Sequence, residues 1–303
     1  MIDNVRIQVI DKVKFENHVE NSKIIQLQSS VALFTGELTE YPKKGKEANL
    51  EVRISKHIAA IIGSLHKYFN ILHLEKNHNH NSFYYSQIVY VVNHLCELFQ
   101  VQERTSLTNL EFGFNLEVEA DPQKIIDYNI LMYDLKNHNR DMKFSGKGDF
   151  KEFQKSDYSL KLYNKSKQYR INKNIFRVEI KITKKRLLEK LGIFKIEDLL
   201  RENIYNKLFD FLEKEFTKVL IIDEFHGLTI PEKDIEKLNK YSNPNYWNTL
   251  RKDKNYKRQN RLKKDFNLLI SKYGLDKTKN ELLEKMKSKF ILLMDSNTLR
   301  EVA

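Results

Sequence analysis

Two short stretches in the middle of the chain alternate apolar and polar residues, and this pattern constrains the fold more than any other feature. In residues 158–165, Leu160 and Leu162 share one face of an extended chain, and the polar residues share the other. In residues 176–182, every second residue is apolar, starting at Phe176. Because period-two alternation is typical of half-buried strands, the two stretches predict a β-hairpin with one apolar and one charged face.

The charged face of this predicted hairpin carries a tyrosine among charged residues. If the strands pair, Tyr163 lies beside Lys161 and Lys165 and near Arg177 and Glu179. A phenol with a pKa of about 10 is protonated at neutral pH and needs a cation or a proton acceptor to act as a nucleophile. We therefore expect Tyr163 to be a catalytic nucleophile, with Lys161 and Lys165 stabilising negative charge. The alternative is an ordinary hairpin with a solvated charged face, because alternation reports burial rather than chemistry.

Further regular elements are predicted along the chain, which has only 9 glycines and 4 prolines. Alternating or apolar patterns predict strands at residues 5–10, 50–54, 58–65 and 107–118. Helical spacing of apolar residues predicts a helix at 85–100. Asp121 followed by Pro122 is a helix-start signal and predicts a helix through about residue 135. The mixture indicates an α+β fold.

The last quarter of the chain has a different composition. Between residues 251 and 289 there are 14 Lys and Arg against 5 Asp and Glu, which accounts for most of the net charge of +12. Apolar residues recur there at helical spacing. We expect a first domain at 1–228 and a basic helical DNA-binding module at 229–303. The residues expected to contact DNA from this module are Arg251, Lys257, Arg258, Arg261, Lys263 and Lys264.

The overall composition narrows the class of partner and the cellular setting. A strongly basic chain points to a polyanion such as nucleic acid, and less often to an acidic membrane surface. Cys96 is the single cysteine, which excludes a disulfide framework and a cysteine metal site. No run of about 18 apolar residues and no secretory signal pattern is found, so we expect a cytoplasmic protein without a membrane partner.

Oxygen-rich residues near the hairpin predict a divalent-metal site. Glu111, Asn115 and Glu117 share one face of the strand predicted at 107–118, and Glu179 lies on the hairpin. Carboxylate and amide oxygens favour Mg²⁺ or Mn²⁺. His66 is a further possible ligand, although a lone histidine is more often structural. The alternative for Glu111, Asn115 and Glu117 is a hydrated sheet face.

Other assignments stay open at this point. Tyr158, five residues from Tyr163, points to the opposite face of a regular strand, whereas Tyr169 reaches the same face only if the strand continues. His78 and His80 form a second possible metal pair, but their surroundings are typical of a loop that contacts DNA or solvent.

Four segments together resemble those of rolling-circle replication initiators, in the group of the filamentous-phage gene II proteins and plasmid replication initiation factors. Residues 159–165 are similar to the family's tyrosine strand ending in Tyr-x-Lys, and residues 176–180 to the Arg-x-Glu strand that follows it. Residues 63–67 look like a Gly-Ser-x-x-Lys segment, and residues 108–115 more loosely like an acidic strand. Where the family usually has Arg, Asp and Asp, this chain has Asn109, Glu111 and Asn115.

This resemblance spans residues 3–200 and implies a ferredoxin-like, HUH-type antiparallel sheet with helices on one face. It implies a site-specific, metal-dependent nickase in which Tyr163 attacks origin DNA, leaving a 5′-phosphotyrosyl link and a free 3′-OH primer. Single-stranded or extruded origin DNA and a host helicase and polymerase are the implied partners. We expect Arg177, Lys181 and Lys67 to contact the DNA near the tyrosine.

Other functions are also compatible with the sequence. One is a structural or RNA-binding protein, although the aromatic residues do not cluster in a stacking pattern that favours it. The same nicking chemistry serves transposition and conjugal transfer, but no additional domain such as a helicase favours them here. A non-catalytic, sequence-specific DNA-binding initiator is the alternative from a different class, and it predicts that Tyr163 is dispensable. The origin sequence, the oligomeric state and the choice between plasmid and phage do not follow from the sequence.

Overall fold

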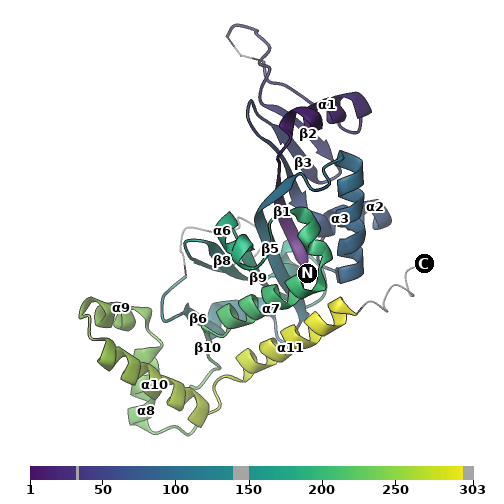
Figure 1. Ribbon diagram of the computed structural model, residues 1–303. Helices are drawn as coiled ribbons and strands as arrows, with labels where there is room; N and C mark the ends of the chain where they lie inside the picture. Colours follow the sequence, from purple (N-terminus) through teal and green to yellow (C-terminus); the bar gives the residue numbers. More distant parts are fainter. Residues whose placement is uncertain (32–33, 139–149, 296–303) are drawn as a thin grey trace.

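An eight-stranded antiparallel sheet dominates the computed structural model, which describes residues 1–31, 34–138 and 150–295 (Figure 1). Its strands follow the order β2-β3-β4-β1-β5-β9-β8-β7, and every neighbouring pair is antiparallel. The strands are β1 (Ile2–Val9), β2 (Lys43–Glu47), β3 (Leu50–Ile54), β4 (Ala59–Ser64), β5 (Thr105–Glu117), β7 (Phe150–Gln154), β8 (Tyr158–Asn164) and β9 (Ile175–Ile182). The predicted hairpin is confirmed as β8 and β9.

A split β-α-β unit forms the centre of this sheet. β4 and β5 both pair antiparallel with β1, one on each side, so they run parallel to each other. Parallel strands need a crossover connection, which is supplied here by α2 (Leu65–Leu74) and α3 (Tyr85–Phe99). This unit places the ends of β1, β4 and β5 side by side with the segment between α2 and α3.

Helices cover the apolar face of the sheet. They include α1 (Lys12–Ser22), α3, α6 (Lys185–Lys190), the 3₁₀ turn η2 (Ile196–Leu200), α7 (Glu202–Phe216) and α11 (Lys277–Met294). On β5, Phe114 contacts Phe209 of α7 and Phe290 of α11, with ring centroids 5.9 and 6.3 Å apart. The predicted antiparallel sheet with helices on one face is confirmed. In the described ranges, no helix combines the length and apolar character needed to span a bilayer.

Three helices near the end of the chain surround a second core. These are α8 (Glu232–Tyr241), α9 (Pro244–Lys252) and α10 (Tyr256–Lys272). Their core contains Trp247 and Phe266, and β6 contributes Met132 to it. α11 instead packs against the sheet through Leu282 and Met286, which belong to the main core. The division at residue 229 stays a prediction, but the last helix packs with the first predicted domain.

The helix predicted from 122 to about 135 is wrong beyond its first turns. Pro122 does start α4 (Pro122–Lys124), capped by Asp121, and a π-helical turn η1 (Ile125–Asn129) follows. The chain then extends as β6 (Ile130–Tyr133) and pairs with β10 (Val219–Ile221). Ile130 and Tyr133 of β6 are buried in the main core and Met132 in the second core, and this two-sided burial outweighs the local helix signal.

Candidate functional site

The pairing register of three strands assembles the polar face at the centre of the sheet. Across β5, β9 and β8, Asn115 lies opposite Arg177, which lies opposite Tyr163. One rung further along, Gly113 lies opposite Glu179, which lies opposite Lys161. Because alternate residues of a strand share a face, both rungs project their side chains to the side away from the helices.

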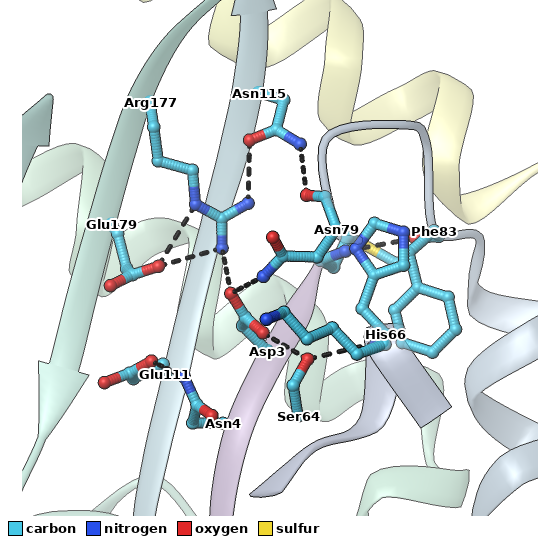
Figure 2. A network of polar contacts seen from close by, with 12 residues as sticks. Asp3, Asn4, Ser64, His66, Asn79, Phe83, Glu111, Asn115, Arg177 and Glu179 are labelled. Atoms are coloured by element: carbon cyan, nitrogen blue, oxygen red, sulfur yellow. Dashed lines mark hydrogen bonds and ion pairs between the residues drawn. The ribbon is translucent and has the colours of Figure 1, made fainter. Parts of the chain in front are cut away.

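Three buried carboxylates converge on this face (Figure 2). Asp3 of β1, Glu111 of β5 and Glu179 of β9 each place one oxygen within 4.8 Å of the others. Asp3 accepts hydrogen bonds from the Ser64 hydroxyl and the Asn79 side-chain amide. Burial, together with the charge of Glu111, raises the pKa of Glu179. The site therefore crowds acidic groups whose repulsion a cation would relieve.

Arg177 organises these carboxylates from within the site. Its Nε and Nη2 donate to Glu179 Oε2 over 3.1 and 2.9 Å, and Nη2 lies 3.5 Å from Asp3 Oδ2. Its Nη1 donates to Asn115 Oδ1 over 3.0 Å. Only 3% of Arg177 is exposed, so its guanidinium faces protein groups rather than solvent.

Tyr163 lies at the edge of the carboxylate cluster. Its hydroxyl donates to Glu179 Oε2 over 3.4 Å. Burial, followed by the charge of Glu179, raises the pKa of Tyr163 well above its usual value. The phenol is therefore protonated at neutral pH, and Glu179 is the carboxylate positioned to accept its proton.

Lys165 is held next to this tyrosine by a short helix. β8 ends at Asn164, whose side chain caps α5 (Lys165–Tyr169), and the cap turns Lys165 back over the sheet. The Lys165 Nζ lies 5.4 Å from the ring centre of Tyr163 and 5.1 Å from that of Tyr169. Burial, then Arg177, lowers the pKa of Lys165 to about 8. A nearly buried ammonium thus lies between two tyrosines.

A hollow of about 560 Å³ opens onto these groups. Its lining includes Asp3, Glu111, Glu179, Tyr163 and Tyr169, together with the lysines Lys46, Lys67, Lys161, Lys165 and Lys181. Carboxylates and the buried Lys165 at the floor, with the other lysines around them, suit a phosphate-bearing substrate held above a cation.

The other lysines predicted near the tyrosine also lie around this hollow. Lys161 Nζ lies 3.8 Å from Glu111 Oε1 and 3.9 Å from Glu179 Oε1, too far for hydrogen bonds. Lys181 Nζ lies 3.0 Å from Glu111 Oε1. Lys67, on the first turn of α2, is half-buried at the rim. Their contact with DNA stays a prediction.

Two of the predicted metal ligands lie in the carboxylate cluster, and two have other surroundings. Glu111 and Glu179 belong to it. Asn115 donates to the carbonyl of Asn79 over 3.0 Å and accepts from Arg177, so both ends of its amide are engaged. His66 is buried, with its ring stacked on Phe83 at 4.6 Å and its Nε2 2.8 Å from Asn81 Oδ1. Asn115 and His66 therefore lie behind the site, where they fix the segment between α2 and α3.

The predicted DNA-contact residues of the second core are placed on α9 and α10. Arg251 donates to the carbonyl of Leu135 over 3.3 Å, which fixes α9 against β6. Lys263 lies 3.9 Å from Asp134. The side chains of Lys257, Arg258, Arg261 and Lys264 are exposed.

Asp3 and Asn79 belong to the site but were missed by the sequence pattern. A register shift between Ile2 and Val5 interrupts the alternation of β1, so period two does not reveal the face of Asp3. Asn79 lies between two histidines, in a segment that reads as a polar loop. Its amide group donates to Asp3 and accepts from the Tyr169 hydroxyl, which joins α5 to the carboxylates.

Comparison with known proteins gives one likeness to report. The solved structure of a rolling-circle replication initiator protein from Geobacillus stearothermophilus is similar to this chain with a TM-score of 0.42 and 13% sequence identity. The match covers 77% of this chain and 89% of that chain. No protein-family model matches the sequence. No curated protein matches it either.

Proposed function

We propose that this protein initiates rolling-circle DNA replication by nicking one strand of origin DNA with Tyr163. The observation that carries the proposal is the position of the Tyr163 hydroxyl, 3.4 Å from a buried glutamate and beside a buried lysine at the floor of an open hollow. A nucleophile within reach of a base, with a cation alongside, is the arrangement that covalent catalysis requires.

The proposed step is an in-line transesterification. The Tyr163 oxygen attacks the scissile phosphorus as its proton passes to Glu179. The bond from phosphorus to the 3′ oxygen breaks, and the 3′ oxygen takes up a proton to become the primer hydroxyl. A 5′-phosphotyrosyl bond replaces the lost ester, so the phosphodiester can be restored later without an external energy source. Lys165 stabilises the negative charge that develops at the tyrosine and phosphate oxygens.

The carboxylate cluster fits a divalent cation. Asp3, Glu111 and Glu179 offer only hard oxygen donors, and the raised pKa of Glu179, caused by burial and then Glu111, reflects their crowding. Mg²⁺ or Mn²⁺ favours this donor set, and when bound it would polarise the target phosphate. Arg177 and Asn79 orient the carboxylates through the hydrogen bonds described above. Glu179 Oε2, which accepts from Arg177 and from the Tyr163 hydroxyl, is the oxygen proposed to take up the tyrosine proton.

The test is formation of a denaturation-resistant protein–DNA adduct. Purified protein is incubated with Mg²⁺ or Mn²⁺ and labelled single-stranded DNA from its own replicon. We expect an adduct in the wild type and in Tyr169→Phe, and none in Tyr163→Phe or in the presence of a chelator. Tyr169→Phe is the comparison variant, because that tyrosine faces the same lysine and lines the same hollow. It also loses the hydrogen bond to Asn79, so we expect a lower adduct yield in this variant but not a loss of the adduct.

Other outcomes separate the alternatives. An adduct that survives Tyr163→Phe and is lost in Tyr169→Phe would retain the enzyme class and move the nucleophile. Tight DNA binding without an adduct under any metal would favour the non-catalytic DNA-binding initiator. The exposed basic side chains of α10 are the feature that favours this second function.

A further inference from the structure

α9 and α10 are joined by a tight turn within one core. Three residues, 253–255, separate Lys252 from Tyr256, and Lys254 adopts a left-handed conformation with φ 53°. The Asn255 side chain caps α10 by accepting from the Arg258 backbone amide. Trp247 of α9 and Phe266 of α10 pack in the same core. A short helix, a tight turn and a longer helix on a shared core are the components of a helix-turn-helix unit.

The two faces of α10 differ sharply. Phe266, Leu269 and Ile270 are buried against α8 and α9. The opposite face is exposed and comprises Lys257, Asn260, Arg261, Lys264 and Leu268. These five positions recur at intervals of three and four residues, so they form one stripe along the helix. The apolar face is already covered, and only the polar stripe remains open to a partner.

The charges of this stripe are not neutralised by the protein. The single acidic residue of α10, Asp265, faces α8, where it accepts from Tyr241 over 2.9 Å and lies 3.1 Å from Lys237. At the end of the helix, Lys272 pairs with Asp234 at 3.0 Å. In the described parts of the chain, the stripe cations Lys257, Arg261 and Lys264 and the neighbouring Arg258 form no ion pair. All four lie in the N-terminal half of α10.

We infer that α9 and α10 form a helix-turn-helix unit whose second helix, α10, enters the major groove of duplex DNA. The major groove, about 12 Å wide, admits an α-helix, and the N-terminal residues of the second helix then meet base edges. Asn260 and Arg261 are of the residue types that pair with adenine and guanine edges, and the neighbouring cations suit the flanking phosphates. This inference rests on the proposed function only in taking DNA as the partner.

Other polyanionic partners fit the stripe less well. A membrane-surface helix presents an apolar face to the lipid, whereas the apolar face of α10 is buried in the protein. Double-stranded RNA has a deep, narrow major groove that side chains cannot read. Single-stranded DNA is recognised by stacking of successive bases on several aromatic side chains, and α10 exposes only Tyr256, at its first position, among its described residues.

The first experiment measures duplex binding by the full-length protein. The probe is a fluorescein-labelled duplex of random sequence, about 30 base pairs or three helical turns long, followed by anisotropy over a range of salt concentrations. We expect the triple variant Lys257→Ala/Arg261→Ala/Lys264→Ala to bind about 10- to 100-fold more weakly. The slope of log affinity against log salt concentration should become shallower by about two to three, since each lost phosphate contact lowers it by about one. The matched control removes three exposed lysines elsewhere, Lys56→Ala/Lys184→Ala/Lys190→Ala, and should bind like the wild type. Equal loss in both triple variants would overturn the inference.

The second experiment tests base reading. Duplexes are selected from a pool with a randomised centre, first with the wild type and then with Asn260→Ala/Arg261→Ala. We expect the wild type to enrich a sequence motif and the variant to lose that motif while keeping most of its random-duplex affinity. If the wild type enriches no motif, or if both proteins enrich the same one, α10 does not read bases. A preference of the wild type for duplex RNA over duplex DNA would also overturn the inference.

The two proposals fail separately in these assays. The α10 triple variant should still form the Tyr163 adduct on a short single-stranded oligonucleotide, and Tyr163→Phe should still bind the duplex. Loss of the adduct with retained α10-dependent duplex binding would reject the nicking function and leave the helix-turn-helix inference standing. The reverse pattern would reject only the inference drawn here.

Discussion

Asp3 is the residue on which the proposed cation site most depends. Its carboxylate faces Glu111 and Glu179 and is held by Ser64 and Asn79. Although burial acts against it, the charges of Arg177 and Lys165 keep the pKa of Asp3 below its usual value. Asp3 is therefore ionised over the physiological pH range and is suited to act as a cation ligand.

We predict that Asp3→Asn weakens Mn²⁺ binding by at least about tenfold, because one of the three anionic ligands is lost. The affinity is measured by titration calorimetry or by the electron paramagnetic resonance signal of free Mn²⁺. Asp210→Asn, which changes an exposed aspartate on α7, should leave the affinity unchanged. Equal affinities in wild type and Asp3→Asn would place the cation elsewhere.

Because Lys165 is buried, we predict that the free energy of unfolding rises with pH above about pH 8. Burial, then Arg177, lowers its pKa from 10.5 to about 8. Between these values the unfolded chain binds more protons than the folded one, so the free energy of unfolding rises with pH. This rise is at most about 1.4 kcal/mol per pH unit. Below pH 8 both states are protonated and the full penalty of the buried charge is present.

Chemical denaturation from pH 7.5 to 9.5 tests this expectation. As the pH rises through this window, the free energy of unfolding of the wild type should increase relative to that of Lys165→Met. The same comparison with Lys56→Met, at an exposed position, should give a constant difference. A constant difference for Lys165→Met as well would show that its ammonium is not destabilised by burial.

At the scale of elements, the pairing of β5 with β9 determines the geometry of the site. Gly113 lies directly opposite Glu179, and a Cβ atom at Gly113 would come within 2.2 Å of the Val178 carbonyl and 2.7 Å of the Glu179 Cα. Contacts this short require one strand to move. Glycine at this position therefore permits the close strand approach that brings Glu111 and Glu179 together.

We predict that Gly113→Ala lowers the free energy of unfolding by about 1–3 kcal/mol through overpacking. It should also reduce the rate of adduct formation, because Glu179 is displaced. Ser106→Ala on the same strand adds no atom and serves as the control. Denaturant unfolding and single-turnover adduct assays measure the two effects. Wild-type stability and rate in Gly113→Ala would show that the strands accommodate the extra methyl group.

Much of the element pattern was predictable from sequence, for identifiable reasons. The hairpin of β8 and β9, and β5 from Leu110 onward, have uninterrupted alternation, so local periodicity is sufficient to locate them. β6 was not predictable, because its four residues follow a strong helix-start signal and extend only by pairing with β10, nearly ninety residues later (219 against 130). The contribution of Asp3 was hidden by the register shift in β1.

At the scale of the whole molecule, two cores are connected by shared elements. β6 sends Ile130 and Tyr133 into the main core and Met132 into the second. α11 leaves the second core and returns along the sheet, as Figure 1 shows. Since β6 is common to both, loss of either core exposes apolar surface on the other.

We predict that Met286→Ala lowers the free energy of unfolding by about 2–5 kcal/mol, because this fully buried side chain of α11 packs in the main core. Trp247, the only tryptophan, reports on the second core. Its fluorescence and the far-ultraviolet circular dichroism should shift together to lower urea concentration. Ile291→Ala, at a 70% exposed position on the same helix, is the control. If Met286→Ala leaves the tryptophan transition unchanged, the two cores unfold independently.

The sequence alone determined the elements whose information is local. Alternation specified the tyrosine strand and its partner, and charge specified a basic end of the chain, because period and composition need no knowledge of distant contacts. The tertiary fold determined that Asp3 joins Glu111 and Glu179, since the three residues lie on strands far apart in the chain and converge through sheet register. It also decided that α11 packs on the sheet, because burial depends on which apolar faces the fold leaves uncovered.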